Sequence, residues 1–167
     1  EATGLQFDFG PADSPRTCDP ARPSNIRVTF GGLGARSFVG KEAKQIPAAL
    51  ATMTLGQMDK SIFSAEDDGT ILHEFGHAIG FQHEHQSPAS SCKDEFNWDF
   101  IYKKLAAVAG WNKDKVDTNF RQLMLPSTRL LTSAFDPESI MLYSLSRDYF
   151  RPEIATPSCF IPNQNTA

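Results

Sequence analysis

Residues 73–83 read HEFGHAIGFQH, and all 4 histidines of the chain lie between His73 and His85. His73 and His77 are one helical turn apart, so both imidazoles project from the same face of a helix and can share a metal ion. Gly80 can adopt the left-handed conformation that ends a helix, which lets His83 return toward the metal as a third ligand. Three neutral imidazoles leave the fourth position of a tetrahedral zinc ion open, as in catalytic zinc sites.

Glu74 directly follows His73 and indicates that the metal site is catalytic. A carboxylate beside the open position can hold a zinc-bound water and accept its proton. The complete pattern H-E-x-x-H-x-x-G-x-x-H is specific and is typical of metzincin metalloproteases. The alternative is a histidine-rich helix that binds no metal. The complete pattern argues strongly against this alternative, whereas H-E-x-x-H alone would be much weaker evidence.

The rest of the chain predicts strands first and helices later. The helix with the histidines is expected to begin near residues 67–70, where acidic and small polar side chains suit a helix N-terminus, and to end at Gly80. Short segments of strand character are expected to form strands at 5–9, 26–30, 37–40 and 52–55. Two further helices are expected at 99–109, whose apolar residues share one face, and at 113–120. This order indicates an α+β fold.

The composition is that of one ordinary globular domain. Of the 167 residues, 40% are hydrophobic and 22% charged, and the net charge is −4 at pH 7. An acidic chain without a basic stripe is expected to bind neither nucleic acid nor an anionic membrane. The longest weakly polar stretch, 46–55, is too short to span a bilayer. Because the first residue is Glu1 rather than Met, we expect a processed piece of a longer protein, which fits secretion.

A second motif identifies the family that the chain resembles. Residues 139–143 read SIMLY, which resembles the S-x-M-x-Y turn of the astacins, one branch of the metzincin endopeptidases, and Glu84 directly after His83 also resembles that branch. The resemblance implies that Met141 lies beneath the zinc histidines. It also implies that Tyr143 ligates zinc in the resting enzyme and turns away to stabilise the transition state. From the residues alone, Met141 could be ordinary core and Tyr143 a buried tyrosine with a satisfied hydroxyl group.

The resemblance covers roughly residues 26–145 and implies a metzincin, zincin-like α+β fold in a single catalytic domain, residues 1–167. We expect an N-terminal lobe of about residues 1–82, with a small twisted sheet and the zinc helix. A loop- and helix-rich C-terminal lobe is expected at about residues 83–167. Metzincins also carry a long backing helix before the strand that residues 5–9 resemble, and astacins continue to a C-terminal helix. Neither helix is readable here, so the domain is expected to be reduced or truncated at both ends.

Four further side chains are weaker candidates. His85 is expected beside the zinc ligands rather than among them, because a fourth protein ligand would close the site. Arg147 follows the SIMLY turn, where metzincins build the S1′ pocket. It is either a cation that favours acidic substrate side chains or a solvated surface arginine, and the second is favoured. Asp67 and Asp68 either help to hold a calcium ion or begin the helix, and a helix N-terminus already explains them.

The chain has 3 cysteines, and no two of them have a C-x-x-C spacing. Cys92 lies just past the zinc segment and Cys159 past the SIMLY turn. We therefore expect a Cys92–Cys159 disulfide within the C-terminal lobe, with Cys18 unpaired or bonded outside this chain. The alternatives are a Cys18–Cys159 disulfide that joins the lobes and, in a cytosolic protein, three free thiols.

Together these features predict a secreted, monomeric zinc endopeptidase of the astacin type that acts on protein or peptide substrates. One Zn²⁺, held by His73, His77 and His83, lowers the pKa of a bound water. Glu74 takes the proton and passes it to the leaving amine, while Tyr143 stabilises the oxyanion.

An extended peptide substrate is expected to pair with an edge strand near residues 52–55. Two other functions are open: a protease-like zinc-binding module with little or no activity, and a zinc amidohydrolase of a non-peptide substrate. Glu74 argues against the first, because a pure binding module needs no base.

Overall fold

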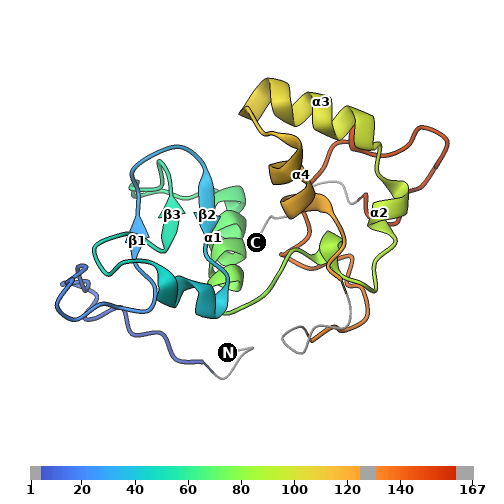
Figure 1. Ribbon diagram of the computed structural model, residues 1–167. Helices are drawn as coiled ribbons and strands as arrows, with labels where there is room; N and C mark the ends of the chain where they lie inside the picture. Colours follow the sequence, from blue (N-terminus) through green and yellow to red (C-terminus); the bar gives the residue numbers. More distant parts are fainter. Residues whose placement is uncertain (1–4, 125–130, 161–167) are drawn as a thin grey trace.

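The computed structural model describes residues 5–124 and 131–160 of the chain. Its helices and strands form two groups that lie side by side (Figure 1). The first group contains the strands and helix α1, and the second contains α2, α3 and α4. The predicted α+β class is therefore confirmed, with a small sheet and the histidine helix first and mainly helices and loops after them.

The sheet has three short strands, β1 (Val28–Thr29), β2 (Ala35–Ser37) and β3 (Met53–Leu55), in the order β1-β3-β2. β1 runs parallel to β3 and β2 runs antiparallel to it, with Val28 and Ser37 on either side of Met53. The expectation that residues 52–55 form an edge strand is wrong, because β3 is bonded on both sides. β1 and β2 are the edges, and β2 is the edge nearer the second group (Figure 1).

Residues 5–9 do not form the predicted strand. The rings of Phe7 and Phe9 stack with their centroids 5.9 Å apart. Both meet the ring of Phe75 on α1 edge-on, at 5.6 and 6.1 Å. Two of the alternating apolar residues therefore place their rings against a helix, and no strand in the described part of the chain pairs with this segment.

Helix α1 (Ala65–Ala78) carries the first two histidines. Ser64 caps it: the hydroxyl oxygen accepts a hydrogen bond from the N–H of Asp67, and the Asp67 carboxylate accepts one from the N–H of Ser64. This reciprocal pair satisfies two N–H groups at the helix start, so α1 begins slightly earlier than predicted. At its other end, Gly80 has a φ of 109°, and the chain turns toward His83 as expected.

The second group has its own hydrophobic core. It is built by α2 (Cys92–Glu95), α3 (Trp98–Ala109), α4 (Lys113–Phe120) and the segment that ends at Cys159. Its buried side chains are Cys92, Phe96, Ile101, Val116, Phe120, Phe150 and Cys159. Three short 3-10 helices complete the fold: η1 (Gly40–Gln45), η2 (Glu84–Gln86) and η3 (Arg147–Tyr149).

Cys92 and Cys159 form the predicted disulfide, with their Cα atoms 5.5 Å apart. Cys18 is free and exposed, so the alternative bond between the two groups is wrong. The disulfide ties the start of α2 to the far end of the described chain and closes the second group covalently.

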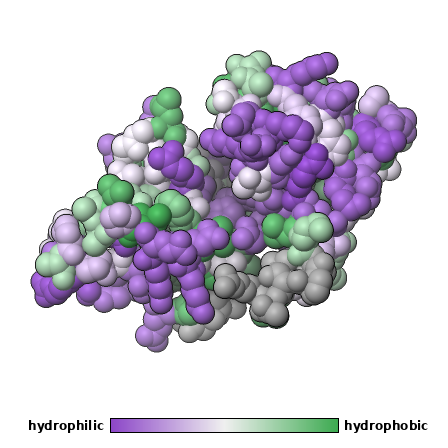
Figure 2. Space-filling model, viewed as in Figure 1, coloured by the Kyte–Doolittle hydropathy of each residue, from purple (hydrophilic) through white to green (hydrophobic). Residues whose placement is uncertain are grey.

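Apolar side chains reach the surface mainly over the first group, whereas the surface of the second is mostly polar in the view of Figure 2. Most of the exposed large apolar residues precede residue 82, among them Phe9, Leu33 and Ile62. In the described part of the chain, no helix combines the length and the apolar character that a bilayer crossing requires.

Candidate active site

The three predicted metal ligands come together. One ring nitrogen from each of His73, His77 and His83 lies within 4.8 Å of the others. The Nε2 atoms of His77 and His83 are 3.1 Å apart, although His77 lies in α1 and His83 lies after the turn that ends this helix. All three side chains are buried. Among the described residues, this is the only such group of three or more metal-ligating side chains.

Backbone carbonyl groups fix the first two rings. His73 Nδ1 lies 2.8 Å from the carbonyl oxygen of Ile140, and His77 Nδ1 lies 2.8 Å from that of Phe81. A carbonyl oxygen only accepts hydrogen bonds, so each Nδ1 carries the proton and donates it. The lone pairs of both Nε2 atoms are therefore left for a metal.

The third ring is held by a side chain that the sequence did not suggest. His83 Nδ1 lies 3.0 Å from the amide oxygen of Gln86, whose side chain is almost fully buried. The only sequence signal is a polar residue three positions after a ligand, on the same short helical turn. This amide leaves the Nε2 lone pair of His83 free in the same way as the two carbonyl groups do.

Burial keeps the three ligands neutral. It lowers the pKa of His73, of His77 and of His83 below the ordinary histidine value, and the neighbouring histidines lower the pKa of His83 further. Three neutral imidazoles that share one point are the donor set of a catalytic zinc site with open positions for water or substrate. The residues therefore fit Zn²⁺.

Glu74 is buried and stands directly after His73 on α1. Burial raises the pKa of Glu74 to about 7. A cation held by the histidines would lower this pKa again, because it favours the ionised carboxylate. One carboxylate oxygen, Oε2, is buried without a hydrogen-bond partner among the described residues, so it is available to a molecule bound at the metal.

Met141 packs under the helix that bears the ligands. Its side chain is buried, and a Cβ atom added to Gly76 would overlap its sulfur atom. Gly76 stands between His73 and His77 in the sequence, so the absence of a side chain there lets the thioether approach the helix backbone. This is the position that the SIMLY turn predicted for Met141.

Tyr143 lies over the ligand group. Its ring centroid is 4.2 Å from that of His83 and 6.0 Å from that of His73. Burial, followed by the charge of Glu74, raises the pKa of Tyr143 well above its ordinary value. The phenol therefore keeps its proton at neutral pH, and its pKa depends on the charge of Glu74.

His85 lies outside the metal-binding group, as predicted. It is almost fully buried, its Nε2 lies 2.8 Å from the carbonyl oxygen of Asn119, and its ring packs between those of His83 and Phe120. Burial lowers the pKa of His85 to about 4, so the ring is neutral. Its role in the described structure is to support the ligand ring beside it.

The remaining candidates have structural roles. The guanidinium of Arg147 donates to the carbonyl groups of Phe150, Arg151 and Ile154 and holds the turn that follows it, so it is not the freely solvated arginine that we favoured. Asp67 is part of the capping box of α1. Within the described residues neither Asp67 nor Asp68 belongs to a group of ligands suited to a metal ion.

Comparisons with known proteins agree with this geometry. Residues 19–158 match the family model described as Astacin (Peptidase family M12A). Astacin-like metalloprotease toxin 4 of Loxosceles laeta is 42% identical over 79 residues, which are 47% of this chain and 59% of that protein. Astacin-like metalloprotease toxin 5 of Loxosceles gaucho is 36% identical over 127 residues, 74% of this chain and 55% of that protein.

A solved structure, that of myroilysin, is also similar. It superimposes with a TM-score of 0.68 and 37% sequence identity, and the match covers 77% of this chain and 62% of that one. The chain thus spans less than two thirds of the length of each of these relatives.

Proposed function

The chain belongs to the astacin family of zinc metallopeptidases, and from this we propose that it is an endopeptidase that hydrolyses peptide bonds in proteins. One observation carries the proposal beyond the family. Glu74 stands directly after the ligand His73 on α1, and its buried Oε2 has no hydrogen-bond partner among the described residues. A site that only stored zinc would have no use for this oxygen.

Glu74 is proposed as the general base. A zinc ion held by His73, His77 and His83 would polarise a bound water molecule and lower its pKa from 15.7 toward about 7. Glu74 Oε2 accepts the proton of the attacking water and then delivers it to the nitrogen of the leaving amine. The neutral histidines contribute no proton to either step, because each Nδ1–H is committed to a carbonyl or amide oxygen.

Tyr143 is proposed as the donor to the developing oxyanion. Its raised pKa keeps the phenol protonated, and its ring position beside His83 supports a hydroxyl group that faces the reacting carbonyl. In the resting enzyme the same oxygen is proposed as a further, weaker ligand of zinc.

The substrate is proposed to pair with β2 rather than with β3. β2 is an edge strand and contacts α1, the helix that carries Glu74. An extended peptide can add to the free edge of β2 through main-chain hydrogen bonds and so reach the metal site in a defined register.

We also propose that residues 1–167 act as one catalytic domain, with lobes that divide near His83, and that it works outside the cell as a monomer. The lobes share a hydrogen bond at the metal ligands, from His73 Nδ1–H to the carbonyl oxygen of Ile140. Secretion is supported by the disulfide and by the similarity to proteins named as toxins.

The experiment that tests this function is digestion of casein by the purified chain, with a chelator and after zinc is restored. Activity that the chelator removes and zinc returns supports an endopeptidase. Zinc binding without cleavage of casein or of small amides indicates a binding module, and cleavage of small amides alone indicates an amidohydrolase. A Glu74→Ala sample purified in the same way controls for contaminating proteases.

A further inference from the structure

We propose that Gln86 is a positioning residue that fixes the orientation of His83, and that through Gln86 the last turn of α4 sets how tightly the chain holds zinc. The proposal rests on the zinc-binding role of His83. It concerns metal affinity, however, and so does not depend on whether the chain cleaves peptides.

The orientation of the Gln86 amide is forced by its neighbours. The side-chain nitrogen lies 2.8 Å from the carbonyl oxygen of Thr118 and 3.0 Å from that of Arg121. Both oxygens only accept, so both hydrogens of the amide group must point at them. The amide oxygen is then left facing His83 Nδ1, at 3.0 Å. Because this oxygen only accepts hydrogen bonds, His83 must carry its proton on Nδ1. The lone pair of Nε2 is then available to the metal.

Among the described residues, Gln86 is the only side chain that accepts a hydrogen bond from Nδ1 of one of the three ligands. His73 and His77 are fixed by the backbone carbonyl groups of Ile140 and Phe81. A side-chain amide can rotate about its χ angles, whereas these two carbonyl groups belong to the backbone and cannot. The orientation of His83 therefore depends on whatever holds the Gln86 amide in place.

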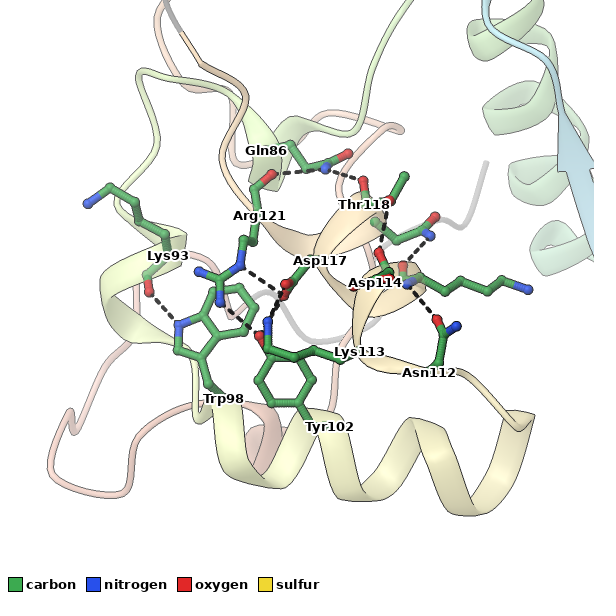
Figure 3. Close-up of polar contacts among 12 residues, drawn as sticks. Gln86, Lys93, Trp98, Tyr102, Asn112, Lys113, Asp114, Asp117, Thr118 and Arg121 are labelled. Atoms are coloured by element: carbon green, nitrogen blue, oxygen red, sulfur yellow. Dashed lines mark hydrogen bonds and ion pairs between the residues drawn. The ribbon is translucent and has the colours of Figure 1, made fainter.

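The end of α4 holds it. Carbonyl groups in the last turn of a helix have no partner within the helix. Here Gln86 binds those of Thr118 and Arg121, and His85 binds that of Asn119. Figure 3 shows the Gln86 amide between Thr118 and Arg121 at this end of α4. The turn that follows the third ligand is thus the cap of a helix in the second group.

α4 is in turn fastened to α3. The Asp117 carboxylate accepts hydrogen bonds from Tyr102 at 2.5 Å and from Lys113, and it pairs with the guanidinium of Arg121 at 2.8 Å. The same guanidinium lies over the ring of Trp98, 4.8 Å from its centroid (Figure 3). The helix end that orients Gln86 is therefore held against α3 by two residues of that helix, Trp98 and Tyr102.

Gln122 provides a matched control. Its side-chain nitrogen donates to the carbonyl groups of Ser87, Pro88 and Ser90, so it also clamps the segment after His83. None of these three hydrogen bonds reaches a metal ligand. Gln122→Met and Gln86→Met both remove an amide clamp, but only the second removes a contact to an imidazole.

The test measures the zinc dissociation constant of the full chain by competition with a chromophoric chelator, and the visible spectrum of the cobalt-substituted protein. Gln86→Met should weaken zinc about 10–100-fold and shift the cobalt spectrum. Gln122→Met should leave both unchanged, although both variants lower Tm. Unchanged zinc affinity in Gln86→Met, or an equal loss in Gln122→Met, would overturn the proposal and leave Gln86 as a helix cap alone.

Gln86→Glu gives a second reading, which decides the question if Gln86→Met does not fold. A carboxylate keeps an acceptor for His83 Nδ1–H but cannot donate to either carbonyl group at the end of α4. If the end of α4 sets the affinity through Gln86, zinc binding should weaken about tenfold although an acceptor for His83 remains. Zinc affinity within about threefold of the wild type would show that an acceptor alone orients His83 and would overturn the role of α4. Failure of the wild-type chain to bind zinc at all would instead contradict the proposed function.

Discussion

Glu74 is the residue whose proposed role as general base distinguishes a peptidase from a protein that only binds zinc. We expect Glu74→Ala to keep its metal and to lose about 10²–10⁴ in rate, because only the proton transfer is removed. The measurement is kcat for a peptide substrate together with zinc content. Glu66→Ala, an exposed glutamate in the first turn of the same helix, is the control. Full proteolysis by Glu74→Ala would remove Glu74 from the mechanism.

Tyr143→Phe deletes one oxygen atom from the site. The variant should fold and bind zinc normally but lose about 10²–10³ in kcat, the usual cost of one donor to an oxyanion. KM should change less, because the interaction forms mainly in the transition state. Tyr149→Phe, in the same partly buried core but away from the histidines, should retain activity. Near-full activity of Tyr143→Phe would show that the phenol is only a packing group.

Gly76 and Met141 form a pair whose coupling can be measured. Alanine normally stabilises a helix by about 1 kcal/mol relative to glycine. Gly76→Ala should nevertheless destabilise the protein by about 1–3 kcal/mol, because the new methyl group overlaps the Met141 sulfur. In a Met141→Ala background the same change should cost less. Urea unfolding of the four proteins gives the coupling energy, and strictly additive effects would contradict the contact.

At the scale of residues, the sequence predicted those features that depend on residues close together in the chain. The ligand trio follows from helical spacing and a glycine turn within one short segment. Gln86 was missed because its role depends on Thr118 and Arg121, which the tertiary fold brings to it from more than thirty residues further along the chain. The hydrogen bonds of Arg147 to Phe150 and Ile154 were missed because an isolated arginine in a sequence shows no partners.

Among the elements, α4 contains a carboxylate, that of Asp117, whose contribution to the stability of the protein should depend on pH. Burial opposes ionisation of Asp117, but hydrogen bonds from Lys113, Tyr102 and Arg121 outweigh it and lower the pKa of Asp117 to about 2. The stabilisation is therefore complete above the unfolded-state pKa of 3.8 and is lost as the pH falls toward 2.

Asp117→Asn should therefore be less stable than the wild type at pH 7, and the difference should shrink between about pH 4 and pH 2. Urea unfolding of chelator-treated protein across this range measures it. Asp114→Asn, on the same helix, is the control. A difference between Asp117→Asn and wild type that is constant with pH would show that the carboxylate charge does not matter.

Helices were predicted better than strands, for a physical reason. The expected helix at 113–120 matches α4 at both ends, and 99–109 misses the start of α3 by one residue. A helix makes its hydrogen bonds within itself, so its pattern is local. A strand needs a partner strand. Residues 5–9 alternate, but no described strand pairs with them and Phe7 and Phe9 pack on Phe75 instead, while the central place of β3 depends on β1 and β2.

For the whole molecule, the Cys92–Cys159 disulfide is the largest single constraint on the unfolded chain. The two residues are 67 apart in sequence, and the chain-entropy model assigns such a loop about 4 kcal/mol. Cys92→Ala/Cys159→Ala should lower the free energy of unfolding of the second group by about that amount. Cys18→Ser, which changes an exposed free thiol, should leave it unchanged. Equal stability of all three proteins in urea would contradict this assignment.

The groups that accept the Nδ1 hydrogen bonds of the three ligands are also synthesised at different times. A chain leaving the ribosome presents all three zinc histidines before Thr118 or Ile140 exists. At that moment only His77 has its fixing carbonyl group, because Phe81 lies inside the zinc segment. We therefore expect the other two imidazoles of a nascent chain to remain free to exchange tautomers. Capture of zinc in its final geometry then waits until the last quarter of the chain has emerged, when Cys159 also becomes available to close the disulfide.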